Sequence, residues 1–502
     1  MDTTSLWKQI TPTSATYPEL TENLDVDVAI IGAGLTGITT ALHLTHAGMH
    51  VAVLEATNVG GVTTAYSTGN LYIATQPYYQ NVIAKCGFTK AQLVAKSREF
   101  AINFIEKTIN TRHLQSKFSR RPWYLYTNKD SKMGFLEKEV EVIKKMGFDI
   151  NLTNHLPLAF KFKKACVMEN QARINPLHYV VTLAESLQQQ GCQIFENTRV
   201  LDIDEKNSCT IKTSTGKIVT AKKVVIATHT PIGVNTIQAF TAPYRSYVVA
   251  ARLQNNQYPE GHFWDLDATH HATCTHATTG TTPDILMVAG SHHKVGQEKN
   301  TKMHYKELES FLRQHFEISE IVNQWSAQHY QSADNVPYIG LANRFAKHTY
   351  MATGYFADGL VYGTIAGIII GDLILNKKNE WTETYNSNRL NLFAAAEFLT
   401  KEDSNTLLQY YKDLPQIPTT NFDDLPLGEG KVVDMDREKW AVYKDDKNKL
   451  HIVSAVCTHM KCIVNWNNAE KTWDCPCHGS RFTTEGNVIE GPAKINLKRR
   501  EE

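Results

Sequence analysis

The chain has 502 residues, of which 42% are hydrophobic and 21% are charged, and its formal net charge at pH 7 is +1. At about 150 residues per domain, this length predicts several domains rather than one. The near-zero charge gives no electrostatic reason to expect nucleic acid or an anionic membrane surface as a partner.

The chain begins without the apolar core of a signal peptide. Its longest apolar run, residues 363–375, is too short to span a bilayer, so no transmembrane segment is expected and the run predicts a buried helix. Scattered cysteines without pairing rhythm are typical of reduced thiols, which predicts a cytoplasmic protein; they are Cys86, Cys166, Cys192, Cys209 and Cys274.

A strand, a glycine loop, a helix and a second strand open the folded part of the chain. The apolar run VDVAII predicts a buried strand, GAGLTG follows, and apolar residues at helical spacing continue to Gly48. In this context Gly32 makes a tight turn, Gly34 lets the backbone approach a pyrophosphate, and Gly37 lets helix and strand pack closely. Glu55, at the end of the second strand, can accept a hydrogen bond from a ribose hydroxyl, so a dinucleotide site is predicted.

The other pieces of this domain lie far along the chain, which favours FAD over NAD. A helix at 178–190 precedes short strands, and the backbone near Val200 could meet an adenine. A hairpin turning at Gly216 leads into a buried strand at 224–227. Near residue 350 a strand, a glycine loop and an apolar helix follow, whose start could direct N–H groups at a flavin; a glycine turn capping a core helix is the alternative.

In order, VAIIGAGLTGITTALHL, RINPLHYV, VVIATHTPI, WSAQHYQSADNVPYIG and TGYFADGLVYGTIAG resemble the D-amino-acid oxidase-like family of FAD-dependent oxidoreductases. The resemblance runs from about residue 25 to 389. It implies an α/β, Rossmann-like and discontinuous FAD-binding domain (about 25–90, 170–235 and 330–389) with an antiparallel-sheet substrate domain. It further implies hydride transfer from the carbon next to an amine nitrogen to flavin N5. The residues implied to line the flavin are Thr63, Thr64, Ser67, Gly354 and Gly359.

AVCTHMKC and WDCPCHGSRF place four of the nine cysteines close together near the far end of the chain. A structural zinc site pairs its ligands at wider spacing, a plain disulfide module leaves the histidines unexplained, and a redox C-x-x-C expects a βαβ neighbourhood. The remaining interpretation, C-x-H with C-x-x-H, suits a [2Fe–2S] cluster with two cysteine and two histidine ligands.

The full string closely resembles the Rieske family. The resemblance implies that Cys457 and Cys475 hold one iron, that His459 and His478 hold the exposed one, and that a disulfide joins Cys462 to Cys477. It places Ser480 where a serine donates to a bridging sulfide of the cluster and raises its potential. A small all-β Rieske domain is thus expected at 428–502, after a helical and Pro-rich linker at 390–427.

FWDLDATHHATCTH groups an aspartate and histidines at spacings like those of a mononuclear iron site: Asp267, His270, His271 and His276. Three interpretations remain: ordinary strand or surface histidines, a wall of the amine pocket, or a metal site. In the pocket, neutral His270 or His271 could accept a proton from an ammonium substrate. His292 and His293 are weaker candidates, expected at the surface of a strand end.

The two redox modules together predict an amine or N-substituted amino-acid dehydrogenase. Electrons would pass singly from reduced FAD to the Rieske cluster, and an external acceptor would collect them at exposed His459 and His478. One alternative is an oxidase that uses dioxygen directly, with a structural or regulatory Rieske module. Another is a redox-responsive binding protein that is not an enzyme.

Overall fold

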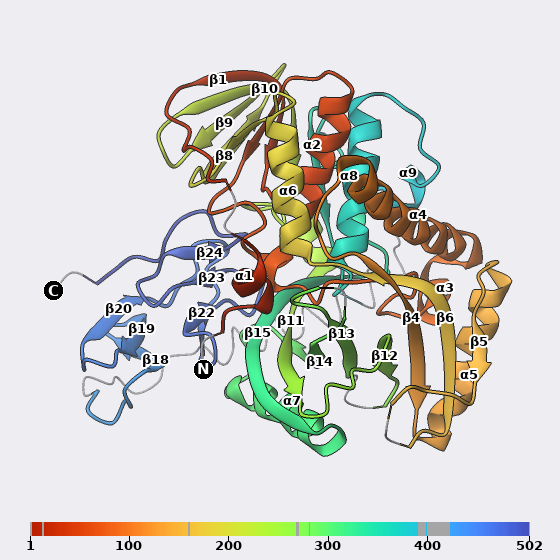
Figure 1. Ribbon diagram of the computed structural model, residues 1–502. Coiled ribbons are helices and arrows are strands. Elements are labelled where there is room, and N and C mark those ends of the chain that lie inside the picture. Colours follow the sequence, from red (N-terminus) through yellow and green to blue (C-terminus); the bar gives the residue numbers. More distant parts are fainter. Residues whose placement is uncertain are drawn as a thin grey trace.

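Four β-sheets organise the computed structural model, which describes residues 3–12, 15–158, 161–267, 271–280, 282–389, 398 and 422–500. An eight-stranded sheet with helices and a nine-stranded sheet lie one above the other, and the carboxyl-terminal strands lie to one side of both (Figure 1). The expected boundary at residue 389 and most of the linker at 390–427 lie outside the described residues, so they stay predictions.

The eight-stranded sheet is the Rossmann-like one, and it is assembled from distant segments. In sheet order its strands are β16 (Tyr338–Leu341), β17 (Thr349–Thr353), β10 (Ile218–Ile226), β1 (Leu24–Ile31), β2 (Val51–Leu54) and β7 (Gln193–Phe195); β9 (Cys209–Thr213) pairs with β10, and β8 (Val200–Glu205) pairs with β9. Strand β1 pairs in parallel with both β2 and β10, β10 with β17, and β2 with β7. The expected discontinuous α/β domain is therefore confirmed.

Helix α2 (Leu35–His46) packs against α8 (Gly359–Ile374), with α6 (Pro176–Gln188) beside it (Figure 1). The two helices approach closely because α8 presents glycines: a Cβ on Gly367 would lie 2.7 Å from the Cβ of Thr39. This confirms the buried helix expected at 363–375, which begins earlier, at Gly359. None of the described helices is long and apolar enough to cross a membrane.

Most strands of the nine-stranded sheet pair antiparallel, as expected for the second domain of the chain. In sheet order they are β15 (Ile318–Ser332), β11 (Thr241–Leu253), β14 (Ile285–Lys294), β13 (Ala272–His276), β12 (His262–Asp265), β4 (Ser119–Thr127), β6 (Lys164–Arg173) and β3 (Asn70–Leu71), with β5 (Asn151–Thr153) beside β6. The other described helices are α1 (Leu6–Ile10), η1 (Thr63–Tyr66), α3 (Tyr79–Cys86), α4 (Phe88–Arg112), α5 (Asp130–Lys145), η2 (Thr236–Phe240), α7 (Lys302–His315) and α9 (Thr382–Tyr385).

The carboxyl-terminal region is all-β, as expected. Its strands are β18 (Glu429–Met435), β19 (Glu438–Lys444) and β20 (Leu450–Ser454) in one sheet, and β21 (Asn465–Asn467), β22 (Thr472–Asp474), β23 (Arg481–Phe482) and β24 (Val488–Glu490) in another. Polar contacts fasten it to the nine-stranded sheet: Arg245 forms a buried ion pair with Glu470 at 3.2 Å. The hydroxyl of Tyr305 donates to the same carboxylate at 2.8 Å.

Candidate active site and metal centre

The glycine loop after β1 forms one end of a cavity of about 630 Å³. Gly32 has a φ of +102°, and a Cβ there would lie 2.7 Å from the carbonyl oxygen of Ala227, so only glycine fits without strain. Gly34 is the N-cap of α2 and lines the cavity. A Cβ on Gly37 would collide with the carbonyl of Gly32. This tightly closed turn before a helix N-terminus fits a dinucleotide pyrophosphate.

Glu55 follows β2, and its buried carboxylate lines the same end of the cavity. Its two oxygens accept hydrogen bonds of 2.8 Å from the backbone N–H groups of Ala33 and Thr57. A carboxylate oxygen has a second lone pair, so it can still accept from a ribose hydroxyl. Val200 lines this part of the cavity too. We call it the nucleotide end.

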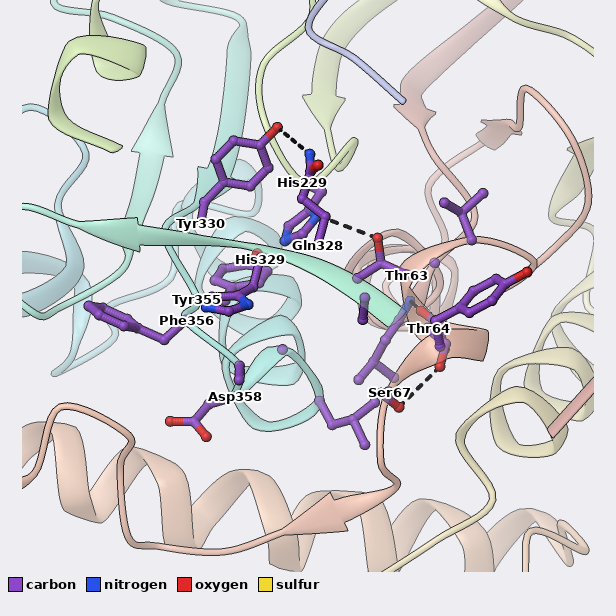
Figure 2. A pocket seen from close by; sticks show the side chains of 18 of the residues that line it. Thr63, Thr64, Ser67, His229, Gln328, His329, Tyr330, Tyr355, Phe356 and Asp358 are labelled. Atoms are coloured by element: carbon purple, nitrogen blue, oxygen red, sulfur yellow. Dashed lines mark hydrogen bonds between the residues drawn. The ribbon is translucent and has the colours of Figure 1, made fainter. Parts of the chain in front are cut away.

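Thr63, Thr64 and Ser67 line the cavity beyond the nucleotide end (Figure 2). The hydroxyl of Thr64 accepts from the N–H of Leu35 at 3.2 Å, and the hydroxyl of Ser67 donates to the Thr64 carbonyl at 3.1 Å. Gly359, the first residue of α8, lines the cavity as well. Gly354 is not among the described lining residues; its φ is +80°, and it shapes the turn after β17.

The opposite end of the cavity, which we call the substrate end, is formed by the nine-stranded sheet. Its described lining includes Val248, Trp264, Asp265, His271, His292 and His329. His271 is nearly buried, with Nδ1 3.2 Å from a carboxylate oxygen of Asp265 and its ring stacked on Phe311. His271 thus lies where the amine-pocket interpretation expects it, whereas His270 lies outside the described residues.

The metal-site interpretation of this segment gains no support from the described side chains. Asp267 accepts a 2.6 Å hydrogen bond from the hydroxyl of Thr127. His276 lies edge-on to the ring of Trp7, 4.9 Å away, and does not line the cavity. The aspartate and His276 therefore have separate partners, and His271 pairs with another carboxylate.

Sequence reasoning missed several cavity residues. His292 is exposed, as expected, and it also lines the cavity, while His293 faces away, 2.9 Å from the hydroxyl of Tyr247. His229 also lines the cavity, and burial lowers its pKa to about 4. His329 and Tyr330 on β15 complete this wall (Figure 2). Neighbouring residues of a strand face opposite sides of the sheet, so the strand register determines which histidine faces the cavity. Knowing that register would have identified these lining residues.

The cysteines and histidines of the carboxyl-terminal motif converge. A disulfide joins Cys462 and Cys477, the pairing that the Rieske resemblance implied. The thiol of Cys475 hydrogen-bonds to the sulfur of Cys457 and lowers the pKa of Cys457, which favours the thiolate that a metal needs. The Cys475 sulfur also lies near both disulfide sulfurs, but disulfide-bonded sulfurs are not thiolate ligands.

His459 and His478 face each other, with ring centroids 4.9 Å apart and planes nearly perpendicular. Nε2 of His459 and Nδ1 of His478 are buried without a hydrogen-bond partner among the described residues. Burial lowers the pKa of His478 to about 4, so its ring is neutral and has a lone pair for a metal. Two thiols and two rings with unused nitrogens fit a [2Fe–2S] cluster.

The histidine edge of this site faces the flavoprotein region. The ring of His459 hydrogen-bonds to the carbonyl of Gly233. The hydroxyl of Tyr330 donates to the carbonyl of His478 at 3.1 Å, and the amide of Gln328 donates to the carbonyl of Gly479 at 2.9 Å. The expectation that both histidines are exposed is wrong: they are half-buried, because β15 and the loop after β10 cover them.

The family comparisons agree with this geometry. A family model described as FAD dependent oxidoreductase matches residues 27–373, and a Rieske [2Fe-2S] domain model matches residues 416–500. The chain belongs to the FAD-dependent oxidoreductase family. This oxidoreductase accordingly binds FAD and, in its carboxyl-terminal domain, a [2Fe–2S] cluster.

Relatives share this architecture or its first part. The Rieske 2Fe-2S iron-sulfur protein YhfW of Bacillus subtilis is 31% identical, over 98% of this chain and 96% of that protein. Gamma-glutamylputrescine oxidoreductase of Escherichia coli is 24% identical, over 44% of this chain and 52% of that protein. The crystal structure of glycine oxidase from Geobacillus kaustophilus superimposes with a TM-score of 0.62 and 15% identity, covering 73% of this chain and 100% of that one, which shows the shared fold.

Proposed function

We propose that this oxidoreductase is an amine or N-substituted amino-acid dehydrogenase that sends its electrons through its own Rieske cluster to an external acceptor. The C–H bond next to nitrogen breaks and its hydrogen leaves as a hydride, the N–H proton is released, and water hydrolyses the imine to a carbonyl compound and an amine. Bound FAD supplies the hydride acceptor and the cluster supplies one-electron steps.

In this proposal Gly32, Gly34, Gly37 and Glu55 hold the ADP half of FAD, and the Thr63–Ser67 segment and Gly359 lie along the flavin. The cluster is held by two thiolates and two imidazoles, from Cys457, Cys475, His459 and His478, while the disulfide fastens the two ligand loops to each other. His271 is a candidate to take up a proton from a substrate ammonium.

Tyr330 carries the proposal. This one residue lines the cavity, where its ring lies edge-on to His229 at 4.9 Å (Figure 2), and it donates to the carbonyl of a cluster histidine. A single side chain therefore contacts both the cavity that would hold flavin and the loop that would hold the cluster. This arrangement favours electron transfer within the chain over a Rieske module that acts only as a structural part.

The test is rapid mixing of the oxygen-free holoprotein with a panel of amines and N-methyl amino acids, followed by visible absorbance. We expect flavin bleaching and then slower bleaching of the cluster. A Cys457→Ser variant that keeps FAD should still show the first phase but should lose turnover with a one-electron acceptor. Flavin bleaching with an oxidised cluster, together with rapid oxygen consumption, would instead identify an oxidase. No bleaching with any donor would refute the proposal.

A further inference from the structure

The charges that line the cavity are unevenly distributed. The charged residues of its described lining are Glu55, Arg199, Asp265, Asp358, Glu490 and Lys494. Both cations lie near the nucleotide end: Arg199 directly precedes Val200 and donates to the carbonyl of Val488 at 3.1 Å. Lys494 pairs with Asp202 of β8 at 3.1 Å. Within the described lining, the substrate end thus has carboxylates but neither lysine nor arginine.

The two aspartates that line the cavity differ in whether their carboxylate already has a cationic partner within the protein. Asp358 is fully buried beside the guanidinium of Arg98, 3.3 Å away, so its charge is already balanced inside the protein. That guanidinium also donates to the carbonyls of Tyr72, Ile73 and Ala74 and does not line the cavity. Asp265 pairs with the imidazole of His271 and lies near the phenol of Tyr78, and neither of these two cavity residues is a permanent cation. Its carboxylate is therefore the anion that a cationic substrate would meet.

His329, on β15, is a further polar group of the cavity wall, four strands away from Asp265 in the sheet. Its side chain is 4% exposed, lines the cavity, and has both ring nitrogens without a hydrogen-bond partner among the described residues. Burial, with smaller contributions from His292 and His229, holds its pKa well below the ordinary value. A buried neutral ring with unused nitrogens binds an N–H donor well, but it gives no charge to balance a carboxylate.

We propose that the substrate is an amine with no carboxylate on the carbon that is oxidised, and that the carboxylate of Asp265 binds its ammonium group. This rests on the proposed function and narrows its substrate class from amines and N-substituted amino acids to amines. An α-carboxylate would lose its hydration in this end of the cavity, next to a like charge and with no lysine or arginine of the described lining to pair with, and this weakens binding.

Binding without turnover tests the inference. Tert-butylamine and 2-aminoisobutyrate both lack hydrogen on the carbon next to nitrogen, so neither can be oxidised, and they differ by one carboxylate. On the oxidised holoprotein, the flavin absorbance shift should give a dissociation constant at least about tenfold lower for tert-butylamine. Tighter binding of 2-aminoisobutyrate, or no binding of either compound, would overturn the inference.

Two variants test how side chains of the cavity wall determine which ligand binds. Asp265→Asn should weaken tert-butylamine binding and leave 2-aminoisobutyrate unchanged, whereas His329→Arg should reverse the preference; FAD content reports whether each variant has folded. Oxygen-free mixing with isopropylamine and alanine then separates the two proposals. Bleaching by alanine alone would overturn the amine inference and leave the dehydrogenase standing, while no bleaching by any donor of the wider panel would refute the dehydrogenase itself.

Discussion

The hydroxyl of Tyr330 donates a hydrogen bond across 3.1 Å to the carbonyl oxygen of His478, and so joins the cavity wall to a loop of the Rieske domain. The amide of Gln328 lies 3.0 Å from the Tyr330 hydroxyl and donates to the carbonyl of Gly479, the residue after His478. A Cβ on Gly479 would lie 2.7 Å from the Cβ of Pro243. The two domains thus meet without a gap at this loop.

Removing this contact should slow electron transfer between the domains. Tyr330→Phe loses one hydrogen bond worth about 1 kcal/mol. The rate of the slower bleaching phase, which reports reduction of the cluster, should therefore fall several-fold while the FAD content stays full. Stopped-flow absorbance measures both. Tyr124→Phe, on β4 and outside the described cavity lining, is the matched control. Equal rates of cluster bleaching in both variants would contradict the role given to Tyr330.

Gly32→Ala should abolish FAD binding, because the added Cβ meets the carbonyl of Ala227 at 2.7 Å in a residue with φ +102°. Gly147 has a comparable φ of +95° but nothing within 4 Å of such a Cβ. Gly147→Ala therefore controls for backbone strain alone and should keep its cofactor. The flavin-to-protein absorbance ratio of each purified variant is the measurement, and full FAD content in Gly32→Ala would count against the site.

Glu470→Gln should strongly destabilise the contact between the Rieske domain and the nine-stranded sheet. The side chains of Arg245 and Glu470 are 1% and 9% exposed, and removing one partner leaves a buried charge unpaired, which costs about 3–5 kcal/mol. A thermal melt should show a large fall in Tm. Glu141→Gln breaks an exposed pair with Lys145 and should leave the Tm unchanged; similar shifts in both would argue against a buried interdomain ion pair.

Ser480→Ala should lower the reduction potential of the cluster. The buried Ser480 hydroxyl hydrogen-bonds to the sulfur of Cys457, and a donor to a ligand sulfur stabilises the reduced, more negative cluster. A redox titration followed by electron paramagnetic resonance measures the shift. Thr484→Ala, on the turn beyond β23, is the control and should leave the potential unchanged; an unaltered potential in Ser480→Ala would exclude this tuning.

Stability should fall as the pH drops below neutrality. Burial lowers the pKa of His262 to about 3, whereas an unfolded histidine titrates near 6.5. Below pH 6.5 the unfolded chain therefore binds a proton that the folded chain does not, and each such group costs about 1.4 kcal/mol per pH unit. His262→Gln should reduce the fall in Tm between pH 7 and pH 5, and exposed His155→Gln should not. An unchanged pH slope in His262→Gln would contradict this.

The motifs whose chemistry is local could be recognised from the sequence. The glycine spacing from Gly32 to Gly37, the acid at Glu55 and the C-x-H and C-x-x-H pairs each lie within a few residues of one turn or loop. Their predicted roles follow from backbone conformation and ligand geometry over that short range, so spacing together with the surrounding strand, helix and loop pattern predicts them. The buried helix at 363–375 was predictable for the same reason, because its apolar run has no polar face.

The tertiary structure decided which side chains face the substrate and which way the cluster faces. His292 and His293 are neighbours on β14, and only the strand register decides that the first lines the cavity and the second faces Tyr247. The half-buried state of His459 depends on Gly233, more than two hundred residues away along the chain. Sequence determined the chemistry available to this protein because motifs are local; packing between distant segments decided where that chemistry is accessible.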